Sequence, residues 1–524
     1  MNSIGRQTTV RPGRWGVAAA LFLALGVGAC DSLLEVDLPS AVTEDAVNDA
    51  SVAPILLSSI MGQFECAYNN FTYDAAGQED NFQMVSGVAG NYSQYTATPG
   101  GGGCGSGAYS QSYRDPLLIA RRQGSQTYNS MVNDWGTSQR LVATTAFYTA
   151  ATLDVFGEHF CEFAIDGGAL MTPANTLDSA EAWVNRTMTA IAAAGVPGGT
   201  FPITTNSGEH TDDIEMSAYG LLARIQWARG DLADAAISAA EVDDGHVTWV
   251  LREEGSSRKN TPSSAQSGGG GIQAAGFLQG PVKLKGATDS YGVTALGSHP
   301  NGTPWTSPVR FTGYIDLGIE TTTGRAINAA GFPVLETDAG AEDDTRVTHT
   351  VGNTAGGPLD IPQRYPNLDD DIPLINWKEM RLIRAEAAGA TQTGIDHVNV
   401  IRAADGLPEI GGGGDDTYRD SLIGDADAYE DMLLEEARRA LWQEGRFWSR
   451  KIIHNEKLWF PRAEGDLINT GASYTFGGGV RQLLSGTEYQ VNENFVALGG
   501  LDARGKGCDA IGEVTSLYQA PVGF

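Results

Sequence analysis

The sequence predicts a mainly α-helical protein in which paired helices form a scaffold and one long, loop-rich segment leaves it. Apolar residues recur at spacings of three or four in several segments, most regularly between Ala428 and Glu456. Residues 213–240 have the pattern of two helices separated by Arg229-Gly230-Asp231. Residues 243–374 shift to Gly, Ser, Thr and Pro with only short β-like runs, so we expect long functional loops with short strands there.

The first 29 residues have the pattern of a lipoprotein signal peptide. Three arginines precede the apolar run Trp15 to Gly28, which is too short to cross the roughly 30 Å hydrocarbon core permanently. Val27-Gly28-Ala29 directly before Cys30 forms a lipobox, so we expect Cys30 to become the first mature residue. It would carry diacylglycerol and an amide-linked chain such as palmitate, and several acyl chains anchor stably. An ordinary secretory signal with an incidental cysteine is the alternative.

We expect residues 30–524 to form one domain. Residues 30–42 would be an extended lipid tether, 43–242 a helical repeat part, 243–374 the loop-rich excursion, and 375–524 a C-terminal helical part with a Gly-rich tail. Residues 66–110 are rich in Gly, Tyr, Asn and Ser and are expected to be ordered surface loops. The expected helices cover 43–64, 115–134, 138–156, 179–194, 213–240 (a pair), 375–388, 394–403 and 428–456.

The segment 428–456 predicts a single long helix packed on one face. Leu434, Ala437 and Leu441 begin its apolar stripe, and charged residues fall mainly on the other side. Gly445 would lie inside this helix at a cost of about 1 kcal/mol relative to Ala. That cost predicts a close approach by another backbone or an aromatic ring at this position.

The charge is strongly acidic. The chain has 64 acidic and 34 basic residues, and loss of Arg6, Arg11 and Arg14 with the leader takes the formal charge from −30 to −33. Binding of nucleic acid or of another anionic polymer needs clustered Lys and Arg, so this composition argues against both.

Four cysteines remain after lipidation: Cys66, Cys104, Cys161 and Cys508. An even number in an exported chain allows two disulfides with three possible connectivities. We favour Cys66 with Cys104, because the Gly-rich loop between them would benefit from a cross-link. Zinc is not expected, since His159-Phe160-Cys161 has no second pair at ligand spacing.

Motifs of catalysis are missing from the sequence. It contains no G-x-S-x-G, no H-E-x-x-H and no G-x-x-x-x-G-K-[ST] pattern. The acidic runs Asp343-Asp344 and Asp369-Asp370-Asp371 lack the regular spacing of a calcium loop and are better explained as solvated turns. We therefore expect no enzyme activity, no metal and no cofactor.

Several motifs in order resemble the SusD/RagB family. Arg438-Arg439, Leu441, Glu444-Gly445, Arg446 and Trp448 are similar to its R-R-x-L-x-x-E-G-x-R-W signature, with Phe447 where the family has arginine and Arg450 where it has aspartate. Trp377 to Ala387 resembles its A-E-A element, with Glu386 as the glutamate, and Val398 to Pro408 resembles its V-N-x-x-R element. Residues 213–240 also resemble one tetratricopeptide repeat, with small residues at the helix crossing.

This resemblance implies a tetratricopeptide-like scaffold and a non-catalytic protein at the cell outer membrane, lipid-anchored and surface-exposed. It would bind oligosaccharides or peptides and deliver them to a SusC-like TonB-dependent transporter. Sugar binding needs flat aromatic faces, and the candidate ligand-binding residues in the loops are Trp249, Tyr291, Trp305, Tyr314, Tyr92 and Tyr95. The alternative is a tetratricopeptide-type scaffold at the outer membrane that binds only a protein partner.

Cys30→Ser tests the anchor, because Cys30 supplies the thiol for lipid transfer. We expect the variant to be released from membranes or to accumulate as an uncleaved precursor, as measured by membrane fractionation and intact mass. Recovery of a normally processed variant in the outer-membrane fraction would contradict the lipobox.

Overall fold

The computed structural model describes the helical parts of the chain and short pieces of the excursion. The chain divides into two units, Met1–Val52 and Ala53–Phe524, and the account below concerns the second. The described residues are 49–79, 83–84, 113–194, 213–255, 258–266, 275–276, 346, 349–354, 357–362, 364–412, 416–454 and 481–510.

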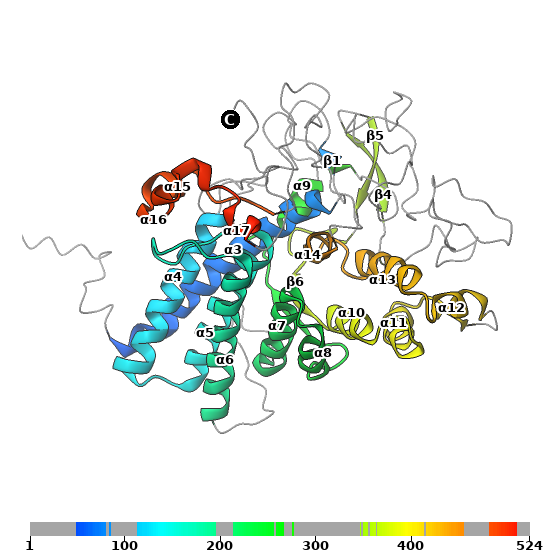
Figure 1. Cartoon of the computed structure of the whole chain (residues 1–524), viewed down its shortest axis with the longest axis horizontal. Coiled ribbons are helices and arrows are strands. Elements are labelled where there is room, and N and C mark those ends of the chain that lie inside the picture. The colour runs from blue at the N-terminus through cyan, green and yellow to red at the C-terminus, as the bar shows by residue number, and fades with distance from the viewer. Residues whose placement is uncertain are drawn as a thin grey trace, which may run out of the picture. The chain divides into compact units, whose positions relative to one another are not determined.

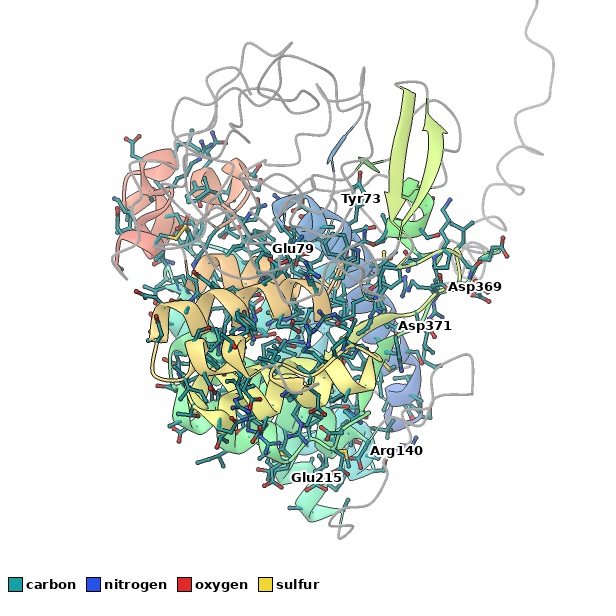
Figure 2. All side chains as sticks on the ribbon, turned by 90° about the vertical axis from the view of Figure 1, so that its right-hand side faces the viewer. Tyr73, Glu79, Arg140, Glu215, Asp369 and Asp371 are labelled. Carbon is teal, nitrogen blue, oxygen red and sulfur yellow. A yellow bond between two sulfur atoms is a disulfide. The ribbon has the colours of Figure 1, made fainter. Side chains whose placement is uncertain are left out.

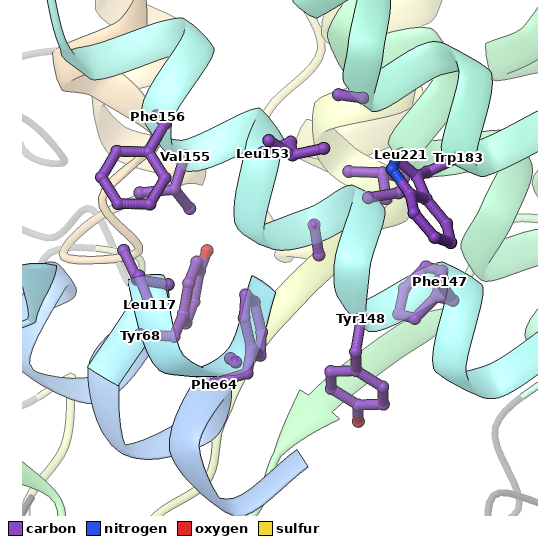
Figure 3. Close-up of a cluster of buried hydrophobic side chains, with 14 of the residues drawn as sticks. Phe64, Tyr68, Leu117, Phe147, Tyr148, Leu153, Val155, Phe156, Trp183 and Leu221 are labelled. Carbon is purple, nitrogen blue, oxygen red and sulfur yellow. The ribbon is translucent and has the colours of Figure 1, made fainter. Parts of the chain in front are cut away.

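Four long helices form the first part of the scaffold (Figure 1). They are α3 (Ala53–Gln78), α4 (Arg114–Ser130), α5 (Gln139–His159) and α6 (Pro173–Ala193), and α4 continues into the π-helical turn η2 (Met131–Trp135). Helix α5 lies at the centre and packs against the other three. Their shared core contains Phe64, Leu117, Phe147 and Trp183 (Figure 3).

A second group of helices continues the scaffold. Helices α7 (Ile214–Arg229) and α8 (Leu232–Ala240) form an antiparallel pair, joined at Gly230 with φ of 89°. They pack on α10 (Trp377–Ala388), which in turn contacts α11 (Gln392–Ala404) and α13 (Ala426–Ala440), with α12 (Thr417–Leu422) beside α13. The predicted helix pair and the helices around 375–388 and 394–403 are confirmed.

The two ends of the excursion meet in a two-stranded sheet. Strand β2 (Val247–Val250) pairs antiparallel with β6 (Ile372–Asn376), so that Val247 lies opposite Asn376. Within the excursion lie α9 (Thr261–Gln266), the hairpin β4 (His349–Thr354) with β5 (Gly357–Pro362), and β3 (Ala275–Gly276), which pairs with β1 (Gln83–Met84). The expected short β elements are therefore present. The mainly helical fold class is confirmed.

A disulfide joins the last helices to the scaffold. Short helices α15 (Gly486–Val491), α16 (Glu493–Ala497), η4 (Gly500–Ala503) and α17 (Lys506–Asp509) form a small cap. Cys508 on α17 forms a disulfide with Cys161, which lies 347 residues earlier, just after α5. Cys66 is also disulfide-bonded. Cys104 lies outside the described residues, so the favoured Cys66–Cys104 pairing stays a prediction.

The prediction of one helix over 428–456 is wrong. Helix α13 ends at Ala440 and α14 (Arg446–Ile453) begins after a turn, residues 441–445, that we call the signature turn. Gln443 and Gly445 both have positive φ, 57° and 77°, which no α-helix contains. The predicted close approach at Gly445 is confirmed, since a Cβ there would lie 3.0 Å from Cε1 of Phe71.

Two other predicted boundaries are wrong. Helix α3 does not end near Phe64 but runs to Gln78, because Tyr68 and Phe71 continue its buried face, where we had expected surface loops. Helix α6 begins at Pro173, six residues before the predicted start, because the Thr172 side chain caps the backbone N–H of Asn175 and proline suits the first helical turn.

Within the described residues, one stretch, Ala50–Ala76, is long and apolar enough to cross a membrane. Its helix α3 nevertheless has buried polar residues, Glu65, Asn69 and Asp74, whose side chains bond other parts of the scaffold. A helix that places ion-paired and hydrogen-bonded side chains in a shared core is a core helix of a folded domain.

Gly445→Ala tests the signature turn, with Gly230→Ala as its matched control. Both glycines have positive φ, but a Cβ at Gly230 meets nothing within 4 Å, whereas one at Gly445 meets Phe71 and Ala75. We expect urea unfolding to show a loss of about 1–2 kcal/mol for the control from backbone strain. Gly445→Ala should lose about 1–3 kcal/mol more from overpacking. Equal losses would show that the contact with Phe71 is unimportant.

Candidate functional site

Of the predicted ligand-binding aromatics, Trp249 lies within the described residues. Tyr291, Trp305, Tyr314, Tyr92 and Tyr95 lie outside them. Trp249 is half-buried in β2, opposite Pro373. The other half-buried aromatics that the structure describes pack on the scaffold: Tyr128 and Trp135 on the first core and Tyr219 on the second. Trp249 packs on neither of these two cores, so its ring stays a candidate platform.

Ion pairs attach the start of the excursion to helix α3. Arg258 lies 3.0 Å from Oε2 of the buried Glu65, and Nη2 of Arg252 lies 3.5 Å from the same oxygen. Asp371, at the other end of the excursion (Figure 2), accepts a 2.6 Å hydrogen bond from the backbone N–H of Arg252. Burial raises the pKa of Glu65, although both arginines lower it, and burial lowers the pKa of Arg252 to about 10. Glu65 and Arg252 are both buried, so their charges are largely removed from water.

Amide side chains fix the segment that follows. The Asn69 side chain on α3 accepts from the backbone N–H of Thr261 and donates to its Oγ1, both at 2.8 Å. Asn260 in turn donates from Nδ2 to the carbonyl of Asp370 at 2.7 Å, and its backbone N–H donates to the carbonyl of Leu368. Residues 258–266 thus connect α3 to the far end of the excursion.

The end of the excursion is attached to the signature turn and to α13. Arg346 and Arg402 both bind the buried Glu436, each at 2.6 Å. Arg364 pairs with Glu444, and the Tyr365 hydroxyl donates to the carbonyl of Gln443 at 3.3 Å. Tyr365, a loop aromatic in the sequence, is therefore a buried structural residue. The excursion is thus attached to the helices at two places, which we call its roots. One root lies on α3 and the other on the signature turn.

Arg446 binds two acids from distant parts of the chain. Its Nη1 and Nη2 donate to both oxygens of Glu158 on α5 at 2.5 and 2.9 Å, and its Nε donates to Glu379 on α10 at 2.7 Å. Burial raises the pKa of Glu158, but the Arg446 guanidinium outweighs it and lowers that pKa to about 2. The charged face that sequence periodicity placed opposite the core is buried and paired.

Arg450 stands where the family signature has aspartate. Its Nη1 lies 2.8 Å from Oε2 of Glu386, the glutamate of the A-E-A element, and that same oxygen accepts from Nε1 of Trp227 at 2.9 Å. The Arg450 guanidinium also stacks over the Trp227 ring, 4.9 Å from its centroid. Glu386 and Arg450, two motif positions 64 residues apart in the sequence, therefore contact each other. Arg450 is thus paired within the scaffold.

Ser449 and His159 lie at the distance of a nucleophile and its base, but they form a structural pair. Oγ of Ser449 is 2.9 Å from Nε2 of His159, whose Nδ1 bonds the carbonyl of Val155. Both side chains are buried, and the His159 ring packs against Phe71 and Trp448. Burial lowers the pKa of His159 to about 3, far from that of a general base working near neutral pH. Ser449 is 2% exposed and therefore belongs to the core of the scaffold.

No group of three or more His, Cys, Asp or Glu side chains that could hold a metal ion occurs in the described part of the chain. The roots of the excursion were not predicted from the sequence. Asn69 and Thr261 are separated by 192 residues, and Arg346 and Glu436 by 90, so no local pattern connects them. The signal for these contacts that the sequence offered was the presence of isolated arginines and asparagines inside a Gly-rich segment.

The fold resembles that of solved SusD-like proteins. A SusD-like protein from Bacteroidetes superposes with a TM-score of 0.50 and 12% identity, covering 88% of this chain and 98% of that one. A SusD/RagB family protein from Bacteroides thetaiotaomicron (TM-score 0.48, 9% identity) covers 86% of this chain and 96% of its own. A laminarin-binding SusD-like protein (TM-score 0.41, 12% identity) covers 78% and 91%.

Neither a family model nor a curated protein matches the sequence. At this level of identity, the superposition with the Bacteroidetes protein shows a shared fold. The resemblance drawn from the motifs is confirmed at that level.

Glu379→Gln tests the buried network, with the exposed Asp178→Asn as control. Glu379 accepts from both Arg224 and Arg446, so removing its charge leaves two buried guanidiniums short of a partner. We expect a loss of about 3–5 kcal/mol in urea unfolding. Asp178 pairs with Arg229 at the surface, where such pairs contribute about 0–1 kcal/mol. A loss of less than about 1 kcal/mol for Glu379→Gln would contradict the structural role.

Proposed function

We propose that this chain, which has the SusD-like fold, is a SusD/RagB family lipoprotein of the cell outer membrane. It binds oligosaccharides at the cell surface and delivers them to a SusC-like TonB-dependent transporter. The fold shared over 88% of the chain supports the family, and the lipobox at Cys30 supports the lipid anchor.

The side chains of the helical scaffold are already engaged in contacts with one another. This observation supports binding of the ligand by the excursion. Four charged residues that face each other across α5, α7, α10 and α14 are buried and paired: Glu158, Arg224, Glu379 and Arg446. The aromatic residues of α3, α5 and α14 fill the core. A helical surface whose polar groups are already bonded internally has few left for a ligand. The excursion has fixed roots on α3 and on the signature turn, as expected for binding loops on a rigid support.

Trp249 fits the chemistry of sugar recognition. An indole ring offers a flat apolar face to the C–H side of a sugar ring, and neighbouring polar groups bind the hydroxyls. Trp249 lies on β2, and the chain continues from this strand to Arg252. Asp371 directly precedes β6, the strand that pairs with β2. The net charge of −30 favours a neutral ligand over a polyanionic one.

The scaffold-only alternative has less support. It predicts a helical groove with short loops, whereas residues 243–374 form an excursion that the protein fixes at both ends through buried ion pairs and amide bonds. Anchoring of this kind serves loops that must hold a shape. Peptide binding by the same loops is a second outcome that the following experiment distinguishes.

Calorimetric titration of the soluble form lacking residues 1–30 tests the proposal. The panel is laminarin oligosaccharides, other neutral glycans, an acidic glycan and peptides. We expect a neutral glycan to bind, and Trp249→Ala to weaken it by about tenfold or more, about 1.4 kcal/mol. The melting temperature should change little, because Trp249 packs on neither of the two described cores. Trp305→Ala and Tyr291→Ala extend the test to the other candidates.

Trp135→Ala is the matched control, because Trp135 is also half-buried but packs on the helical core. It should lower the melting temperature and leave affinity unchanged. Binding of peptides alone would move the assignment to peptide uptake. If no panel member binds and no β-barrel transporter co-purifies from the native membrane, the scaffold alternative replaces the proposal.

A further inference from the structure

One carboxyl group in the buried network lacks a cation of its own. Asp154 lies on α5, one helical turn before Glu158, and is 1% exposed. The guanidinium atom recorded nearest to it is Nη1 of Arg224, 3.8 Å from Oδ2, which is too far for a hydrogen bond. Its other oxygen, Oδ1, has no hydrogen-bond partner among the described residues.

The two guanidiniums of this network, those of Arg224 and Arg446, donate hydrogen bonds to the other two acids, Glu158 and Glu379. Arg446 donates to Glu158 and Glu379, and Nη2 of Arg224 donates to Glu379 at 2.6 Å and to the carbonyl of Leu374 at 2.6 Å. Three carboxyl groups therefore share two cations. We call these five residues the junction: Asp154, Glu158, Arg224, Glu379 and Arg446.

We propose that Asp154 is a neutral carboxylic acid in the folded protein at pH 7, and that folding therefore takes up one proton. Burial of an ionised carboxylate whose oxygen lacks a hydrogen-bond donor is unfavourable, and protonation removes the buried charge. With Asp154 neutral, the junction contains two carboxylates and two guanidiniums and is balanced.

The groups around Asp154 agree with this protonation state. Burial and then the negative charge of Glu158 raise the pKa of Asp154 well above its ordinary value, and Arg224 and Arg446 only partly oppose them. Burial raises the pKa of the Tyr68 hydroxyl on α3, although the same two arginines lower it. This phenol is therefore un-ionised. His159 is neutral, and Arg481 donates to the backbone carbonyls of Gly157 and Glu158.

The sign of the pH dependence follows. In the unfolded chain an aspartate has a pKa near 3.9 and is ionised above about pH 5. Since the folded-state pKa is higher, the folded protein holds a proton that the unfolded chain releases. Between about pH 5 and pH 7 this group alone therefore makes the unfolding equilibrium constant rise about tenfold for each pH unit, and folding is stronger at the acidic end.

Urea unfolding of the purified full-length protein at pH 5, 6 and 7 tests the proposal by comparing wild type with Asp154→Asn. Asparagine imitates the neutral acid and binds no proton in this range. We expect the unfolding constant of wild type to rise about tenfold more per pH unit than that of Asp154→Asn, a difference of one proton. Glu79, whose pKa burial raises to about 8, contributes equally to both proteins and cancels.

Glu158→Gln is the matched control on the same helix. Its carboxylate is ionised and bound to Arg446, so this variant should unfold at clearly lower urea than Asp154→Asn at pH 7. Parallel pH profiles for wild type and Asp154→Asn would overturn the proposal. A loss for Asp154→Asn as large as that for Glu158→Gln would do the same.

Infrared spectroscopy of wild type gives a second measurement that needs no variant to fold. Protein labelled with ¹³C-carboxyl aspartate should show an isotope-shifted C=O band of a protonated carboxyl at pH 7. The label separates this band from Glu79. Absence of any protonated aspartate band at pH 7 would refute the proposal even if Asp154→Asn does not accumulate.

Discussion

The guanidinium of Arg446 is the interaction on which the rest of the scaffold depends. It joins α14 to α5 through Glu158 and to α10 through Glu379, residues 288 and 67 positions away in the sequence. Two charges removed from water cost several kcal/mol each, and only paired geometry with full hydrogen bonding offsets that cost. An arrangement of the helices that separated these three side chains would leave buried charges without a partner and would therefore be disfavoured.

The same region sets the position of the excursion. Glu79, at the end of α3, accepts from the backbone N–H groups of Phe447 and Trp448 and so satisfies the start of α14. The signature turn immediately before α14 receives Arg364 and Tyr365 from the excursion through Glu444 and Gln443. Because α3 also holds the other root through Glu65 and Asn69, both ends of the loops depend on helices that Arg446 and Glu79 lock together. A loop support of this kind can keep its shape while the loops vary.

Two residues depart from the SusD/RagB signature that the sequence resembles, Phe447 and Arg450, and both have partners in this structure. Phe447 replaces an arginine next to Trp448, and its backbone N–H still serves Glu79. Arg450 replaces an acid, and Glu386 on α10 compensates it together with Trp227. At both positions the residue of this chain is buried and has a partner.

The sequence by itself determined the helical class, the α7–α8 pair and the close approach at Gly445. These depend on local patterns: periodicity of apolar residues and Gly at turns. The break between α13 and α14, the extension of α3 to Gln78 and the roots of the excursion were decided by tertiary structure alone. Apolar spacing continues across the signature turn, so periodicity predicted one helix, and only the packing of Phe71 against Gly445 shows why the chain turns there. The Cys161–Cys508 disulfide likewise joins residues 347 positions apart, a distance over which cysteine spacing allows three pairings and only the folded chain brings the two sulfurs together.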